Sequence, residues 1–193
     1  MSEVALWWIG TGDADTGLLE GVRVHVERVF RRPARLELAE ARPEDAFDVR
    51  RNQHSSHRTL LWLASRRPRP AARILGLTDA DLFIPILTFV FGEAQLKGRA
   101  AVVSTARLIG MGLPGESARL AVRLRTEAIH ELGHTFGLLH CRDSRCAMAR
   151  SPSLRHVDAK SPVLCRACRA RTLELSENGD DHEQEEHANP DRR

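Results

Sequence analysis

Three histidines, one glutamate and one glycine lie at fixed offsets in the stretch HELGHTFGLLH, residues 130–140. His130 and His134 are four positions apart, so on a helix both imidazoles point the same way and can bind one metal ion. Glu131 would lie beside that metal, where a carboxylate can take a proton from a zinc-bound water whose pKa is lowered to about 7. The alternative is a helix with surface histidines, but this chain's residue frequencies make such a pattern rare by chance. The spacing therefore predicts hydrolytic zinc chemistry.

Two histidines leave the ligand set incomplete, because hydrolytic zinc has three protein ligands and one open position. Gly137 supplies the geometry for a third ligand, since glycine at a helix end adopts a left-handed conformation at little cost and reverses the chain. His140 follows three residues later and is predicted to return to the metal. His54 and His57 are weaker candidates, because nothing near them in the sequence completes a site.

The chain has four cysteines, all in one short region and grouped in two close pairs: Cys141, Cys146, Cys165 and Cys168. Two pairs of thiolates can form a closed, tetrahedral, structural zinc site. Disulfides and unpaired thiols remain as alternatives, although a chain without an export signal disfavours disulfides. Cys141 directly follows His140, so a zinc ion held by the cysteines would stiffen the segment that carries the third histidine.

Met148 lies two residues after Cys146. A single methionine most often fills a core, but a histidine motif of this form followed by a methionine is the metzincin signature. With the four cysteines, the pattern resembles the archaemetzincin (archaelysin) family of zinc peptidases, over residues 1–172. The segment DLFIPILTFVFGEAQLKGRAAVVSTARL is also similar to that family's strand region.

The resemblance implies roles for the residues of the motif. His130, His134 and His140 would bind a catalytic zinc, Glu131 would be the general base, and Met148 would form the Met-turn beneath the metal. The four cysteines would bind a second, structural zinc, so the expected cofactors are two zinc ions. The chain contains no tyrosine, so the tyrosine that some metzincins place near the metal is absent.

The resemblance also implies the fold, an α/β (α+β) metzincin-like zincin. A mixed twisted sheet would pack on a backing helix and an active-site helix, with a small C-terminal zinc-stapled subdomain. One peptidase domain would cover residues 1–172, with an upper part (1–137) and a lower part (138–172) that holds the Met-turn and the cysteines. Residues 176–193 are acidic, with few apolar groups, and are predicted to be disordered.

Hydrophobic periodicity indicates where the main elements lie. Apolar residues at helical spacing predict helices over residues 15–30, through Leu63 to a stop before Pro68, and from Glu116 to Gly137. Short apolar or alternating runs predict strands within residues 3–10, 34–41, 72–85, 88–94 and 99–108. The strand at 88–94 is either ordinary core or an edge that pairs with an extended substrate.

Composition narrows the classes of protein. The net charge of +3 combines an acidic end with a body of about +9, but nearly all basic residues are arginine, which more often reflects genome composition than nucleic-acid binding. No apolar run is long enough for a membrane span, and the first residues do not read as a signal peptide. We expect a cytoplasmic monomer that acts on a peptide or protein substrate, with no nucleic-acid or membrane partner.

The predicted function is that of a zinc-dependent metallopeptidase in which Glu131 activates the zinc-bound water. Because an unrestrained peptidase is a hazard in the cytoplasm, an aminopeptidase or a processing enzyme of narrow specificity is favoured. The alternative is a zinc-containing protein that binds peptides with little or no turnover. An adaptor for nucleic acid or protein built on the four cysteines is a further alternative, but it leaves the histidine motif unexplained.

Overall fold

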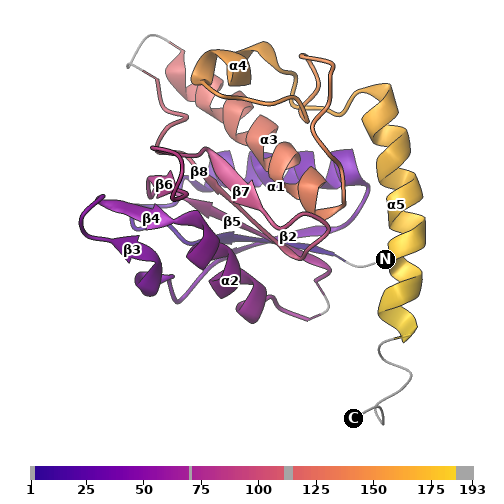
Figure 1. Ribbon diagram of the computed structural model, residues 1–193, viewed down its shortest axis with the longest axis horizontal. Coiled ribbons are helices and arrows are strands. Elements are labelled where there is room, and N and C mark those ends of the chain that lie inside the picture. The colour runs from indigo at the N-terminus through magenta and orange to yellow at the C-terminus, as the bar shows by residue number, and fades with distance from the viewer. Residues whose placement is uncertain (1–2, 70, 111–114, 186–193) are drawn as a thin grey trace.

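A five-stranded mixed sheet forms the centre of the molecule (Figure 1). The structure is a computed structural model that describes residues 3–69, 71–110 and 115–185, with side chains described as far as Leu175. The strand order is β2-β1-β5-β8-β7. The four parallel strands are β1 (Val4–Trp8), β2 (Ala34–Leu38), β5 (Arg73–Thr78) and β8 (Ala100–Ser104). At one edge, β7 (Gly92–Ala94) pairs antiparallel with β8.

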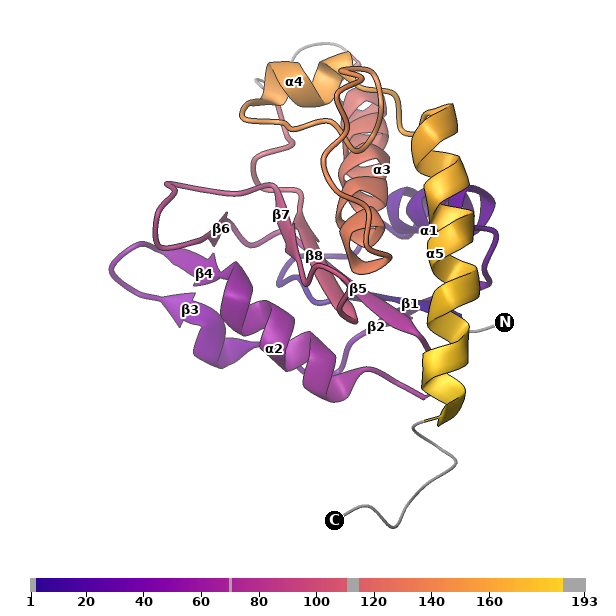
Figure 2. The same ribbon diagram turned by 45° about the vertical axis from the view of Figure 1, so that its right-hand side comes forward.

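Helices cover both faces of this sheet (Figure 2). Helices α1 (Thr16–Phe30) and α3 (Glu116–Thr135) lie on one face, and α2 (Ser56–Arg66) lies on the other. Successive side chains of β8 alternate between the two cores, as a strand requires: Ala101 and Val103 belong to the core with α1 and α3, and Ala100 and Val102 to the core with α2. Burial on both faces explains why β5 and β8 read as nearly continuous apolar runs, whereas the outer strand β2 alternates with charged residues.

The rest of the fold consists of a second, smaller sheet and two helices that follow α3. A three-stranded sheet lies beside α2, with strand order β3-β4-β6. Its strands are β3 (Phe47–Asp48), β4 (Gln53–Ser55) and β6 (Leu82–Phe83), preceded by the 3-10 helix Glu44–Ala46. After α3 come the short helix α4 (Leu154–Ala159) and the long helix α5 (Arg166–Glu185). No helix in the described part of the chain is long and apolar enough to cross a membrane.

The predicted helices at 15–30, before Pro68 and from Glu116 are confirmed, and so is the mixed sheet. The segment at 88–94 differs, because only Gly92–Ala94 is a strand. The reason lies in the carbonyls of residues 87 and 88, which accept hydrogen bonds from the side chains of Arg51 and Gln53 instead of from a neighbouring strand. Backbone pairing upstream of β7 is reduced to an isolated bridge between Leu82 and Val90.

Helix α5 is described as far as Glu185 and includes the first residues of the acidic end. This helical assignment does not test the disorder predicted for residues 176–193. Residues 186–193 lie outside the described residues, so disorder there stays a prediction. The division at residue 137 also stays a prediction, and Cys146 and Met148 share one hydrophobic core with α1 and α3.

Candidate metal centre

The C-terminal half of α3 presents His130 and His134 one turn apart on the same face. Each ring is oriented by a backbone carbonyl: Nδ1 of His130 lies 2.8 Å from the oxygen of Ala147, and Nδ1 of His134 lies 2.8 Å from the oxygen of Leu138. A neutral imidazole that donates from Nδ1 keeps the lone pair of Nε2 free. The two Nε2 atoms lie 3.2 Å apart, so both lone pairs face the same point.

The end of α3 returns the chain so that His140 meets the other two histidines. Gly137 has a φ of +90°, in the left-handed region, and it ends the helix. Its N–H donates to the oxygen of His134 at 2.9 Å, and the N–H of Leu138 donates to the oxygen of Gly133 at 2.9 Å. This pair of bonds is a Schellman motif, which satisfies the last carbonyls of the helix.

The three histidines fit a zinc ion by their donor set. One ring nitrogen from each of His130, His134 and His140 lies within 4.8 Å of the others. Burial lowers the pKa of all three imidazoles, most strongly that of His130, so they stay neutral at neutral pH and can donate lone pairs. Three neutral imidazoles, two of them with tautomers fixed by backbone carbonyls, are a ligand set that hydrolytic zinc accepts, with one position left for water or substrate.

Glu131 lies beside this cluster in a cleft of about 700 Å³. One wall of the cleft is formed by residues 87–94, which include β7, and the other by α3 and residues 150–152. Only 6 % of Glu131 is exposed. Burial raises the pKa of its carboxyl well above the ordinary value of 4.5; the nearby charges of Glu127 and Glu93 raise it further, and the charge of Lys160 opposes them. A carboxylate with a raised pKa is suited to accept and return a proton near neutral pH.

Two glycines let the chain approach these groups closely. A Cβ at Gly92 on β7 would lie 2.8 Å from Cγ of Glu131 and 2.6 Å from the oxygen of Val102. A Cβ at Gly133 on α3 would lie 2.4 Å from the sulfur of Met148, which is fully buried against that helix. Sequence reasoning missed both glycines, because their partners lie on other elements. It did single out Met148, which packs where a hydrophobic floor beneath the histidines is expected.

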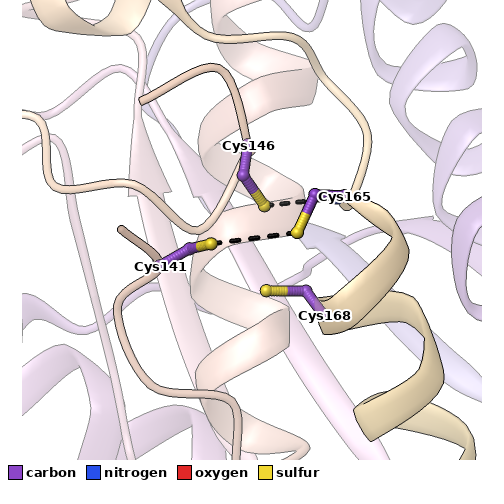
Figure 3. A group of neighbouring side chains, drawn as sticks. All are labelled: Cys141, Cys146, Cys165 and Cys168. Carbon is purple, nitrogen blue, oxygen red and sulfur yellow. Dashed lines mark hydrogen bonds between the residues drawn. The ribbon is translucent and has the colours of Figure 1, made fainter. Parts of the chain in front are cut away.

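The four cysteines converge directly behind the histidine cluster. Their sulfurs lie within 4.8 Å of one another and point toward a common centre (Figure 3). Cys141 and Cys146 come from the loops after α3, Cys165 precedes α5, and Cys168 lies in its first turn. All four are free thiols, and the sulfurs of Cys141 and Cys165 are 3.8 Å apart. A disulfide has an S–S distance of about 2.05 Å, so Cys141 and Cys165 are not bonded to each other, and the four sulfurs could hold one metal ion.

Backbone N–H groups tie the cysteine cluster to the segment that holds Met148 and tie its two pairs to each other. The N–H of Cys141 donates to the oxygen of Met148 at 2.9 Å, and the N–H of Cys165 donates to the sulfur of Cys146 at 3.3 Å.

Burial raises the pKa of the Cys146 and Cys168 thiols, whereas the backbone N–H of Cys168 lowers the pKa of Cys165. A bound zinc ion overrides such differences, because it deprotonates a coordinating thiol outright.

The structure does not bring His54 or His57 to either cluster. His54 lies on β4 with its ring against Phe47, and His57 lies in the first turn of α2. His156, which the sequence places between the cysteines, lies instead with its Nδ1 2.8 Å from the hydroxyl of Ser153. Neither of the described groups of metal-ligating side chains includes any of these three histidines.

Comparison with known proteins agrees with this geometry. The profile of peptidase family M54 matches residues 71–174. The archaemetzincin of Methanopyrus kandleri is 48% identical over 126 residues, which are 65% of this chain and 69% of the relative. The archaemetzincin of Haloquadratum walsbyi is 41% identical over 131 residues, which are 65% of this chain and 75% of the relative.

Solved structures show the same likeness across most of the fold. The crystal structure of the Methanopyrus kandleri archaemetzincin superposes with a TM-score of 0.80 at 35% identity, covering 91% of this chain and 96% of that one. A zinc-dependent peptidase from Methanocorpusculum labreanum gives a TM-score of 0.77 at 29% identity, covering 88% and 99%. The chain therefore belongs to peptidase family M54, the archaemetzincins, and is a zinc metallopeptidase.

Proposed function

We propose that His130, His134 and His140 hold the catalytic zinc and that Glu131 is the general base of peptide-bond hydrolysis. The observation that carries this proposal is the convergence of three neutral imidazoles, each able to offer a ring nitrogen, beside a buried carboxyl in an open cleft. Cys141, Cys146, Cys165 and Cys168 hold a second, structural zinc, which gives two zinc ions per chain.

The chemistry divides between the metal and the chain's own side chains. Bound zinc supplies a Lewis acid that polarises the scissile carbonyl and lowers the pKa of water. Glu131 accepts a proton from the attacking water and returns it to the amine that leaves. The buried position of Glu131 raises the proton affinity of its carboxylate, and a bound zinc ion would act against that rise. The carbonyls of Ala147 and Leu138 hold the first two histidines in the tautomer that faces the cleft.

The substrate lies extended along β7. This strand is at the end of the sheet, so the side of its backbone that faces away from β8 can pair with a peptide. Main-chain pairing of this kind fixes the register of a peptide without demanding a particular sequence. Glu93 lines the same cleft; one oxygen of its carboxylate accepts a hydrogen bond from the hydroxyl of Ser56, and the other can pair with the free amino group of a substrate. This favours an aminopeptidase, or a processing enzyme of narrow specificity, over a broad endopeptidase.

The four thiols bear on the cellular setting of the protein. Four free cysteines grouped for a metal suit a reducing compartment, which supports a location in the cytoplasm. We propose that the protein acts as a monomer on peptides, with no nucleic-acid partner.

Digestion of a mixed-sequence peptide library tests the function, with every new terminus identified by mass spectrometry. The protein is assayed as purified, after metal removal, and after zinc is restored. We expect cleavage that disappears with the metal and returns with it. A matched library with acetylated N-termini separates the two modes, because an aminopeptidase leaves it intact and an endopeptidase cuts both. Tight peptide binding without any new terminus, at full zinc content, would favour the non-hydrolytic alternative.

A further inference from the structure

The side chain of Lys160 is buried directly beneath the histidine cluster. It is 1% exposed, and it comes from the residue that follows α4. Its ammonium lies 2.7 Å from Oε1 of Glu127 on α3. It also donates to the backbone oxygens of Ala147 and Ala149, at 3.2 Å each. An ammonium group has three N–H donors, so these three acceptors satisfy it completely.

The acceptors are groups that fix the metal site. Ala147 and Ala149 flank Met148, so Lys160 holds the Met-turn backbone on both sides of the buried methionine. The oxygen of Ala147 is also the atom that orients Nδ1 of His130. One carbonyl thus joins the lysine to a proposed zinc ligand, while Glu127 ties the same lysine to the helix that carries that ligand.

We propose that Lys160 is a positioning residue for the histidine metal site, acting through the Ala147 carbonyl on the orientation of His130. The inference rests on the proposed function, in which His130 is a zinc ligand. The Lys160 ammonium holds the Ala147 carbonyl in one direction, and that carbonyl holds the His130 ring in one orientation. Partners of this kind, behind a ligand histidine, typically change metal affinity by about 10–100-fold when they are removed.

Stability alone does not account for a buried lysine here. A buried ion pair costs much desolvation, and a well-packed apolar pair of similar volume is often as stable or more stable. Arginine would not replace it, since a planar guanidinium cannot direct donors to three acceptors arranged around one compact nitrogen. What the lysine adds is a single compact group that holds the carbonyls of Ala147 and Ala149 in fixed directions.

The test uses the full-length protein loaded with Co²⁺, because cobalt reports on the two sites separately. Cobalt bound by thiolates gives charge-transfer bands, and cobalt bound by the three histidines contributes only d–d bands. The key variant combines Glu127→Gln with Lys160→Met, which removes both charges and leaves no buried charge unpaired. The matched control is Arg155→Met, which removes one positive charge from the exposed surface of neighbouring α4.

We expect the double variant to keep the thiolate bands, to change the d–d bands, and to bind Co²⁺ at the histidine site about tenfold more weakly. Its kcat should fall while KM stays near that of the parent, and Arg155→Met should match the parent in every respect. Glu127→Gln alone should keep the parental d–d bands, because Lys160 still holds both carbonyls.

Two results would overturn the inference. One is a folded double variant with parental d–d bands and parental Co²⁺ affinity. The other is a change of the same size in Glu127→Gln alone, which would assign the effect to the carboxylate. A parent protein that binds one Co²⁺, with thiolate-site bands only, would instead refute the proposed histidine site, and the inference would fall with it.

Discussion

Replacing Gly92 by alanine should lower the rate of hydrolysis without removing zinc. A Cβ at this position would lie 2.8 Å from Cγ of Glu131, whereas ordinary contact begins at 3.4 Å, so the two must separate by about 0.6 Å. The strand cannot simply retreat, because the same Cβ would lie 2.6 Å from the backbone oxygen of Val102 on β8. The backbone φ of Gly92 is not in the left-handed region, so the effect comes from space alone.

The size of the effect follows from that displacement. A misplacement of about 1 Å can cost about 100-fold in rate, so a shift of about 0.6 Å should lower kcat about 10- to 100-fold. This corresponds to about 1.4–2.7 kcal/mol of transition-state stabilisation. KM should change little, because Glu131 acts on the water and not on substrate binding. The assay is steady-state hydrolysis of a peptide substrate, with zinc content measured on the same sample.

Gly21→Ala is the matched control, since a Cβ there would meet nothing within 4 Å and Gly21 lies inside helix α1. It should leave kcat unchanged and raise stability by up to about 1 kcal/mol. The reasoning is refuted if Gly92→Ala hydrolyses peptide at the parental rate. It is equally refuted if the variant loses activity only in proportion to lost zinc.

Three further predictions concern stability. Burial raises the folded-state pKa of Glu131 above its ordinary value of 4.5, so in the metal-free protein this carboxyl costs stability above that pH. Urea unfolding should therefore show metal-free Glu131→Gln to be more stable than the parent at pH 7, with the gain vanishing as the pH falls through 4.5. Gly137→Ala should lower the free energy of unfolding by about 1–2 kcal/mol, measured by thermal unfolding, because alanine is strained at a φ of +90°. It should also weaken zinc binding by His140. Cys146→Ala should lower the melting temperature and leave one zinc per chain by elemental analysis, since it removes a ligand of the four-thiolate site.

The sequence predicted the parts of the site that depend on local spacing. A helix places residues four apart on one face, so the approach of His130 and His134 follows from the pattern alone. The left-handed Gly137 and the return of His140 also follow, because a helix end has few ways to reverse the chain. The four cysteines could be grouped for the same reason, since two close pairs with metal-ligand spacing suit one zinc ion.

The parts that depend on tertiary packing could not be predicted. Position 92 must be glycine because the Glu131 side chain on α3 lies against it, and the sequence of a three-residue strand does not predict that contact. Lys160 reads as an exposed residue in a polar loop, and only the fold shows it buried against Glu127. The shortening of the strand at 88–94 depends on side-chain donors from Arg51 and Gln53, more than thirty positions upstream.

The central claim is that a zinc ion held by three histidines hydrolyses peptides with Glu131 as the base. The most direct measurement compares kcat of the parent with that of Glu131→Gln, at equal and verified zinc content, on one peptide that the parent cleaves. A general base contributes about 10²–10⁴ in rate, so we predict a loss of at least about 100-fold while both zinc ions remain bound. Hydrolysis by the variant at a rate close to that of the parent would contradict the account.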